Sequence, residues 1–227
     1  MKREIIKTRD GSATIYLPEW NEHYHSKHGA LQEAEHVFIK SGFKHYLSEN
    51  KPEEISVLEI GFGTGLNALL SFFEAEKARV KMNYTGVEAY PVSEEELKAL
   101  DYAEVVSGEN TSGVFQKLHE TEWEKPNKIS TFFSLQKEKK FFSEISAFED
   151  FDLIYFDAFG PRVQPDLWSE EVFRNMYRAL REKGVLVTYS AKGDVRRAMQ
   201  AAGFTVERLA GPPGKREMLR ATKMGAC

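Results

Sequence analysis

The spacing of hydrophobic residues changes repeatedly along the chain from about residue 55 onward. Short apolar runs of strand length alternate with stretches in which apolar residues recur at helical spacing, as Leu66, Leu69, Leu70 and Phe73 do. This alternation is typical of βαβ units, which place parallel strands in one sheet and helices on its faces. The sequence therefore predicts an open, doubly wound α/β sheet.

Seven apolar runs are expected to form the strands of this sheet. They cover residues 55–60, 82–89, 129–135, 152–158, 184–190, 204–210 and 216–222. The last two are joined by the short segment GPPGK, which leaves no room for a crossover helix. We therefore expect a seven-stranded, mostly parallel sheet whose last strand runs antiparallel.

Three helices carry recognisable start or stop signals. Ser93 and Glu96 have the spacing of a capping box, and Ser169 precedes an acidic first turn. A short helix in 193–203 is closed by Gly203. These signals place helices between the expected strands.

The first fifty residues have a different character, rich in glycine, histidine and aromatic residues. We expect them (1–50) to form a small N-terminal extension that acts as a lid over the active site of the main domain, 51–227. Several polar side chains in one loop-like stretch indicate a site more readily than a core. The candidates are Asn21, Tyr24, His25, Ser26, His28 and Glu33.

Composition restricts the class of protein. The hydrophobic fraction is 41%, the charged fraction 29% and the formal net charge -4, as in ordinary globular proteins. No apolar run is of membrane-spanning length, the first residues are charged, and the single cysteine is Cys227. We expect a cytoplasmic protein with no membrane segment and no disulfide.

The C-terminal end is basic although the whole chain is acidic. Residues 192–227 contain eight Lys and Arg against three Asp and Glu, a surplus of five. Such an end suits a polyanion bound at one face. A solvated charged surface is the alternative that charge alone leaves open.

A glycine-rich turn follows the first strand of the main domain. Gly61, Gly63 and Gly65 form G-x-G-x-G rather than the dinucleotide pattern G-x-G-x-x-G. Glu59 precedes this loop, and Glu88 ends the next strand, where an acid accepts the two ribose hydroxyls of an adenosine. The arrangement resembles the first motif of Rossmann-like methyltransferases, which implies S-adenosyl-L-methionine as cofactor. A merely structural turn is the alternative.

The predicted cofactor residues come from this loop and from neighbouring strand ends. They are Glu59, Gly61, Gly63, Thr64, Gly65, Asn67, Glu88, Asp157 and Phe159. An acid after the third strand would hold the adenine amino group, and Gln136 and Glu138 are candidates for this position.

Asp157 stands at the end of the apolar run 153–156 and precedes an irregular loop. Pro161 and Pro165 keep this loop from becoming helical. Ligands of open α/β sheets bind beyond the carboxyl ends of the strands, so we expect Asp157 to be the catalytic residue. The alternative, a helix cap, conflicts with a helix signal that begins only at Ser169.

Four segments in order resemble one known family. DGSATIY with NEHYHSKHGALQEAEHVFI, then LEIGFGTGLN, FDAFGPRVQPDLW and AAGFTVERLAGPPGKREML are similar to the methyltransferase domain of the MnmC family. The resemblance implies a class I methyltransferase that methylates the 5-aminomethyl amine of the wobble (2-thio)uridine in tRNA. The family's FAD-dependent oxidoreductase domain has no counterpart in this sequence.

Substrate contacts are expected from the lid, the Asp157 loop and the basic end. Those near the base are Tyr24, His25, Ser26, Phe159 and Pro161, and those near the phosphates of the anticodon region are Lys192, Arg196, Arg197, Lys215 and Arg216. The histidines lack the partners of a metal site, so the expected chemistry uses no metal. Two alternatives stay open: a methyl- or aminopropyltransferase for a small amine, and a nucleotide-binding module without turnover.

Overall fold

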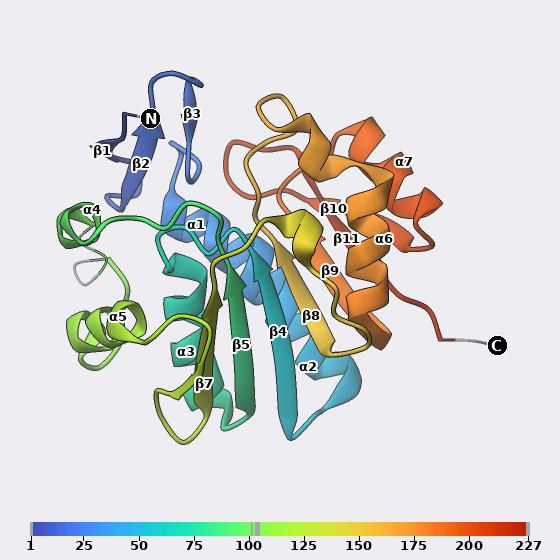
Figure 1. Cartoon of the computed structure of the whole chain (residues 1–227), viewed down its shortest axis with the longest axis horizontal. Coiled ribbons are helices and arrows are strands. Elements are labelled where there is room, and N and C mark those ends of the chain that lie inside the picture. The colour runs from blue at the N-terminus through green and yellow to red at the C-terminus, as the bar shows by residue number, and fades with distance from the viewer. Residues whose placement is uncertain (1, 101, 103–104, 226–227) are drawn as a thin grey trace.

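The computed structural model describes residues 2–100, 102 and 105–225. The predicted unpaired Cys227 lies outside these ranges. Figure 1 shows a central sheet with helices on both sides and a small sheet above one end, formed by the N-terminal strands. Among the described residues, no helix has both the length and the apolar character needed to span a membrane.

The central sheet has eight strands in the described chain, in the order β10-β11-β9-β8-β4-β5-β7-β6. Their bounds are β4 (Glu54–Ile60), β5 (Lys81–Val87), β6 (Pro126–Lys128), β7 (Phe133–Glu138), β8 (Phe151–Phe156), β9 (Leu180–Thr188), β10 (Thr205–Ala210) and β11 (Glu217–Thr222). The additional strand is β6, three residues long and antiparallel to β7 at the sheet edge. The prediction of seven strands missed it because three polar residues carry no strand pattern.

Strand directions agree with the expected architecture. β4 pairs in parallel with both β5 and β8, whereas β11 is antiparallel to β9 and to β10. The third predicted strand lies four residues further on, at β7, because Ile129 and Ser130 form a turn that closes onto the carbonyl of Phe133. The mostly parallel Rossmann-like sheet is confirmed.

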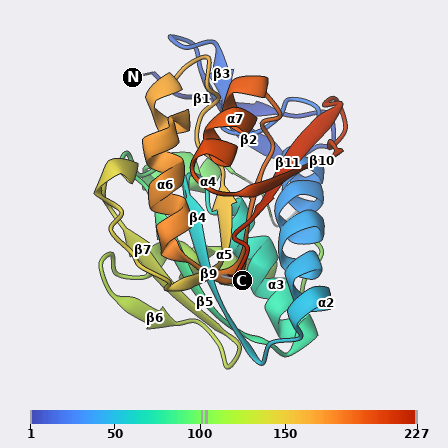
Figure 2. The ribbon, with the colours of Figure 1, turned by 90° about the vertical axis from the view of Figure 1, so that its right-hand side faces the viewer.

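Side chains of the central strands alternate between two buried layers. In β8, Leu153 and Tyr155 belong to one hydrophobic cluster, and Ile154 and Phe156 belong to the other. Successive strand residues point to opposite faces, so a strand buried on both sides reads as a continuous apolar run. Helices α6 (Glu170–Ala179) and α7 (Gly193–Ala201) cover the second face (Figure 2).

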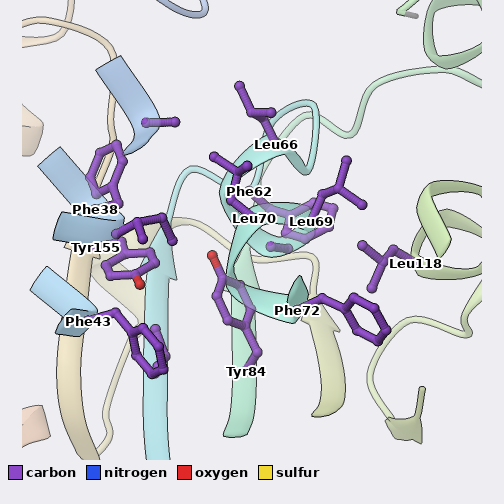
Figure 3. Packing of buried hydrophobic residues seen from close by; sticks show 14 of the residues in the cluster. Phe38, Phe43, Phe62, Leu66, Leu69, Leu70, Phe72, Tyr84, Leu118 and Tyr155 are labelled. Atoms are coloured by element: carbon purple, nitrogen blue, oxygen red, sulfur yellow. The ribbon is translucent and has the colours of Figure 1, made fainter. Parts of the chain in front are cut away.

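The opposite face is covered by α3 (Leu66–Ala78) and by one continuous helix over residues 30–50. This helix comprises α1 (Ala30–Ala34), a π-helical stretch (Glu35–Lys44) and α2 (His45–Asn50). Phe38 stacks against Tyr155 with ring centroids 5.2 Å apart, beside Phe43 (Figure 3). Residues 30–50 therefore pack on the sheet itself, and only the segment before them remains as a candidate lid.

The segment before this helix forms a separate three-stranded sheet of β1 (Glu4–Lys7), β2 (Ala13–Leu17) and β3 (Glu22–His23). The α-helices described between β5 and β6 are α4 (Glu94–Ala99) and α5 (Thr111–Glu120). The predicted caps are present: Ser93 and Glu96 form a capping box at α4, and Ser169 accepts from the amide of Val172 at α6.

Candidate active site

A pocket of about 850 Å³ lies at the carboxyl ends of β4, β5 and β8. This is the sheet edge at which open α/β folds bind their ligands. Residues from the glycine loop, from the N-terminal sheet and from the loop after β8 all line it. Its volume falls within the usual range for sites that hold a small organic ligand.

The glycine loop requires glycine for two different reasons. Gly61 has φ +89°, and a Cβ there would lie 2.7 Å from the carbonyl oxygen of Asp157. Gly65 also has positive φ, and a Cβ there would lie 2.9 Å from Nε2 of His119. Gly61 therefore lets the loop pass against the end of β8, whereas Gly65 lets α5 pack behind the loop.

Glu88 follows β5 and is joined to the glycine loop. Its carboxylate accepts from the backbone N–H of Gly63 at 3.0 Å and from that of Tyr90 at 2.9 Å. Each oxygen keeps a lone pair for another donor, because a carboxylate offers about four acceptor sites. A pair of vicinal ribose hydroxyls fits this arrangement.

Exposed aromatic rings flank the pocket near Glu88. Tyr90 is 61% exposed and Phe141 is 55% exposed, with ring centroids 6.1 Å apart in an edge-on arrangement. Both line the pocket, together with Phe142 and Ser143. This wall is the part of the pocket next to Glu88. Gln136 and Glu138 hydrogen-bond to each other and do not line the pocket.

Asp157 follows β8 and lines the pocket. Its Oδ2 accepts from Nδ2 of Asn67 at 2.9 Å. Burial raises the pKa of Asp157 to about 7, and the charge of Glu33 acts in the same direction, whereas the Asn67 bond and Lys215 oppose it. A pKa raised toward neutral pH suits a group that accepts a proton during catalysis.

Glu59 lies behind the glycine loop and not in the pocket. It is 1% exposed, and its two oxygens accept from Asn67 Nδ2 and from the Tyr84 hydroxyl, each at 2.8 Å. Burial raises the pKa of Glu59 well above its ordinary value. The structure gives the predicted cofactor residue Glu59 a position that contacts Asn67, so any effect it has on a ligand is indirect.

The N-terminal segment contributes aromatic side chains, the aromatic cover, to the pocket wall. Trp20 and Tyr24 contact the Phe159 ring edge-on, at centroid distances of 5.6 and 5.0 Å. His25 also lines the pocket, and burial lowers its pKa to about 4, so its imidazole is neutral. Of the six predicted lid residues, Tyr24 and His25 line the pocket and the other four do not.

Two arginines hold this cover in place. Arg3 donates to the carbonyl of Tyr90 and forms an ion pair with Glu96 beyond β5. Arg162, in the loop after β8, donates to the carbonyl of Asn21 and to Glu22. The N-terminal segment is thus bound on both sides of the pocket by contacts far apart in sequence.

The predicted phosphate contacts divide into two groups. Lys215 forms an ion pair with the buried Glu33, and its Nζ lies 3.8 Å from the centroid of the Tyr189 ring, so it packs behind a residue of the pocket wall. Lys192 and Arg216 are exposed, and Arg196 is partly buried.

Two residues predicted to contact the base, Ser26 and Pro161, do not line the pocket, and Ser26 donates its amide N–H to Glu33.

Tyr189 is a pocket residue that the sequence analysis missed. It follows β9, the strand next to β8, and its hydroxyl donates to the carbonyl of Ala158 at 2.8 Å. The rule that located Asp157, a polar residue at a strand end, would have found it. No comparable signal marked the other missed pocket residues, which include Arg3, Trp20, His23 and Tyr90.

His36 is structural: its Nε2 donates to the carbonyl of Ala210.

The residues present suit S-adenosyl-L-methionine. The glycine loop shares the pocket with two acids, Glu88 and Asp157, which could accept from ribose hydroxyls and face a sulfonium, respectively. Gly63, Thr64 and Asn67 line the pocket between them. Among the described residues, no group of three or more His, Cys, Asp and Glu is arranged to hold a metal ion. The metal-free chemistry remains a prediction.

Known proteins resemble this chain in sequence and in fold. A family described as S-adenosyl-L-methionine-dependent methyltransferase matches residues 114–224. The "tRNA 5-methylaminomethyl-2-thiouridine biosynthesis bifunctional protein MnmC" of Paraburkholderia phymatum is 30% identical over 231 residues, 95% of this chain and 34% of that protein. The protein of the same name from Polaromonas naphthalenivorans is 29% identical, over 97% of this chain and 36% of that one. The chain thus spans about a third of these relatives.

Solved structures show the same fold. MNMC2 from Aquifex aeolicus superposes with a TM-score of 0.81 at 23% identity, covering 99% of this chain and 72% of that one. Spermidine synthase from Thermotoga maritima superposes with a TM-score of 0.57 at 15% identity, covering 98% and 69%. At these identities the likeness establishes the fold alone.

Proposed function

We propose that the chain, which is similar to the methyltransferase domain of the MnmC relatives, uses S-adenosyl-L-methionine to methylate a primary amine on tRNA. The acceptor is the amine of 5-aminomethyl-(2-thio)uridine at the wobble position, and the product is 5-methylaminomethyl-(2-thio)uridine. The names of the MnmC relatives support this acceptor. The cytoplasm, where tRNA is modified, is the expected location.

The observation that carries the proposal is the position of Asp157. Its carboxylate shares one pocket with the glycine loop, Glu88 and an aromatic cover. When bound, S-adenosyl-L-methionine supplies an electrophilic methyl group on a sulfonium. Asp157 accepts a proton from the incoming alkylammonium, directly or through water, and so provides the free nitrogen lone pair that attack requires. The fixed pocket holds the two reacting groups in line.

The aromatic residues of the cover suit a flipped base. Enzymes that modify a single base extrude it and hold it by stacking and by polar contacts. Trp20, Tyr24 and Phe159 form one aromatic group at the pocket wall. We assign them to the uracil ring, and the exposed Lys192 and Arg216 to phosphates outside the pocket.

Transfer of labelled methyl separates this function from its alternatives. The protein is incubated with methyl-labelled S-adenosyl-L-methionine and with tRNA carrying the 5-aminomethyl group, or with diamines and polyamines. We expect label in the wobble nucleoside of digested tRNA and none in the small amines. Label confined to small amines would favour a small-molecule transferase, and no transfer to any acceptor would favour a binding module.

The pH dependence of methyl transfer should respond to Glu33. The negative charge of Glu33 raises the pKa of Asp157, whereas Lys215 lowers it. In Glu33→Gln the raising charge is lost and Lys215 stays, so the acid limb of kcat/KM should move to lower pH by roughly one unit. Glu35→Gln, an exposed change two residues along the same helix, is the control and should leave the profile in place. An unchanged profile in Glu33→Gln would contradict this electrostatic assignment.

A further inference from the structure

Asn67 connects two acids that come from different strands. It is the second residue of α3 and is 3% exposed. Its Nδ2 donates to Oε1 of Glu59 at 2.8 Å and to Oδ2 of Asp157 at 2.9 Å. An amide nitrogen has two hydrogens, so both are committed to carboxylates at the ends of β4 and β8.

Glu59 fixes the direction of this amide. Its other oxygen, Oε2, accepts from the hydroxyl of the buried Tyr84 at 2.8 Å. Tyr84 belongs to β5, so Glu59 is held from the neighbouring strand and from α3 at once. With one hydrogen of Asn67 held by Glu59, the other has a defined direction toward Asp157.

The third polar atom of Asn67 indicates why an amide is kept here. Its Oδ1 is buried and has no hydrogen-bond partner among the described residues. A buried acceptor without a donor destabilises the fold, and the flanking Leu66 and Ala68 are apolar and buried. Packing alone would favour an apolar side chain at this position. The observed contacts that favour an amide over an apolar side chain are its two N–H donations to Glu59 and Asp157.

Asp157 uses only one of its oxygens in the described structure. Oδ2 accepts from Asn67, whereas no described residue donates to Oδ1. We propose that Asn67 is a positioning residue that ties Oδ2 of Asp157 to the Glu59 anchor and so presents Oδ1 to the substrate amine. This inference rests on the proposed function of Asp157.

Other charged and titratable groups surround Asp157 and stay unchanged in the test. Glu33 and Lys215 act on it from helix 30–50 and from the loop before β11, and Glu59 acts from β4. Tyr84, Tyr102 and Tyr189 also interact with its charge. Because Asn67 carries no charge, its removal changes a hydrogen bond and leaves these charges in place.

The test follows the Asp157 carboxyl directly. Carbon-13 NMR of protein labelled in its Asp carboxyl carbons gives the pKa of Asp157, whose signal is identified by its absence in Asp157→Asn. In Asn67→Ala the ionised form loses a hydrogen bond, so this pKa should rise by about one unit. In Asn67→Asp an added negative charge should raise it further. The acid limb of kcat/KM should move upward in the same order.

Ser71→Ala is the matched control. Ser71 lies one turn further along α3, is fully buried, and hydrogen-bonds to the Tyr155 hydroxyl rather than to an acid. It should leave both profiles in place. An unshifted Asp157 in Asn67→Ala and Asn67→Asp, or an equal shift in Ser71→Ala, would overturn the inference. The NMR titration needs no turnover, so it decides the role of Asn67 even if the wild-type protein transfers no methyl to tRNA and the proposed function fails.

Discussion

Asp157→Asn should slow methyl transfer by about two to four orders of magnitude, the range that a positioned general base contributes. The amide keeps the size of the side chain but cannot accept the proton of the substrate ammonium. Binding of S-adenosyl-L-methionine, measured by calorimetry, should change far less than turnover, measured with saturating tRNA and cofactor.

The fold of this variant should survive. Burial raises the pKa of Asp157 to about 7, above its value in the unfolded chain. At a pH between these two pKa values, the native state keeps a proton on this carboxyl that the unfolded chain has lost. The contribution of this group to stability therefore falls as pH rises from about 4 to 7. At pH 8 the variant should melt no lower than the wild type.

Asp166→Asn is the control for this prediction. Asp166 also lines the pocket, but it is exposed and lies in the short 3-10 helix Pro165–Trp168 rather than at the end of β8. Its replacement should leave turnover within a few-fold of the wild type. Full activity of Asp157→Asn would show that Asp157 does not accept the proton of the substrate amine.

Gly61→Ala should weaken binding of S-adenosyl-L-methionine at least a hundredfold, or about 3 kcal/mol. The new Cβ would lie 2.7 Å from the backbone oxygen of Asp157, at φ +89°. Relief of this contact has to separate the glycine loop from the end of β8, because the backbone oxygen cannot rotate away. Both walls of the pocket would move.

Gly11→Ala separates backbone strain from this collision. Gly11 also has positive φ, at +87°, but a Cβ there would meet its nearest atom only at 3.9 Å. This variant should lose a little stability, about 1–3 kcal/mol from strain, and bind the cofactor normally. Isothermal titration calorimetry and thermal melts test both variants. Normal binding by Gly61→Ala would show that the loop has no close contact with the cofactor.

The sequence alone predicted the elements whose cause is local. A continuous apolar run predicts a buried strand, as in the run that ends at Phe156. The capping pattern at Ser93 predicts a helix start in the same way, because both patterns are read from neighbouring residues alone. Asp157 was located because a strand end next to the first strand must face the ligand edge. The glycine loop was identified by its G-x-G-x-G spacing, which is typical of a tight turn between a strand and a helix.

Features that depend on distant contacts were not predicted. Helix 30–50 packs on the sheet through Phe38 and Tyr155, which lie 117 positions apart, so its polar sequence alone does not distinguish it from the lid segment before it. The sequence shows the charge of Lys215 but not its ion pair with Glu33, which joins residues 182 positions apart. The link from Glu59 through Asn67 to Asp157 needs three strands and a helix in their final places.

A crystal structure with bound S-adenosyl-L-methionine tests the central claim most directly. The ribose hydroxyls should lie within about 3 Å of the Glu88 carboxylate, and the sulfonium methyl should face Oδ1 of Asp157 across a space open to Trp20 and Phe159. A cofactor bound away from the glycine loop, or one whose methyl group points away from Asp157, would contradict the account.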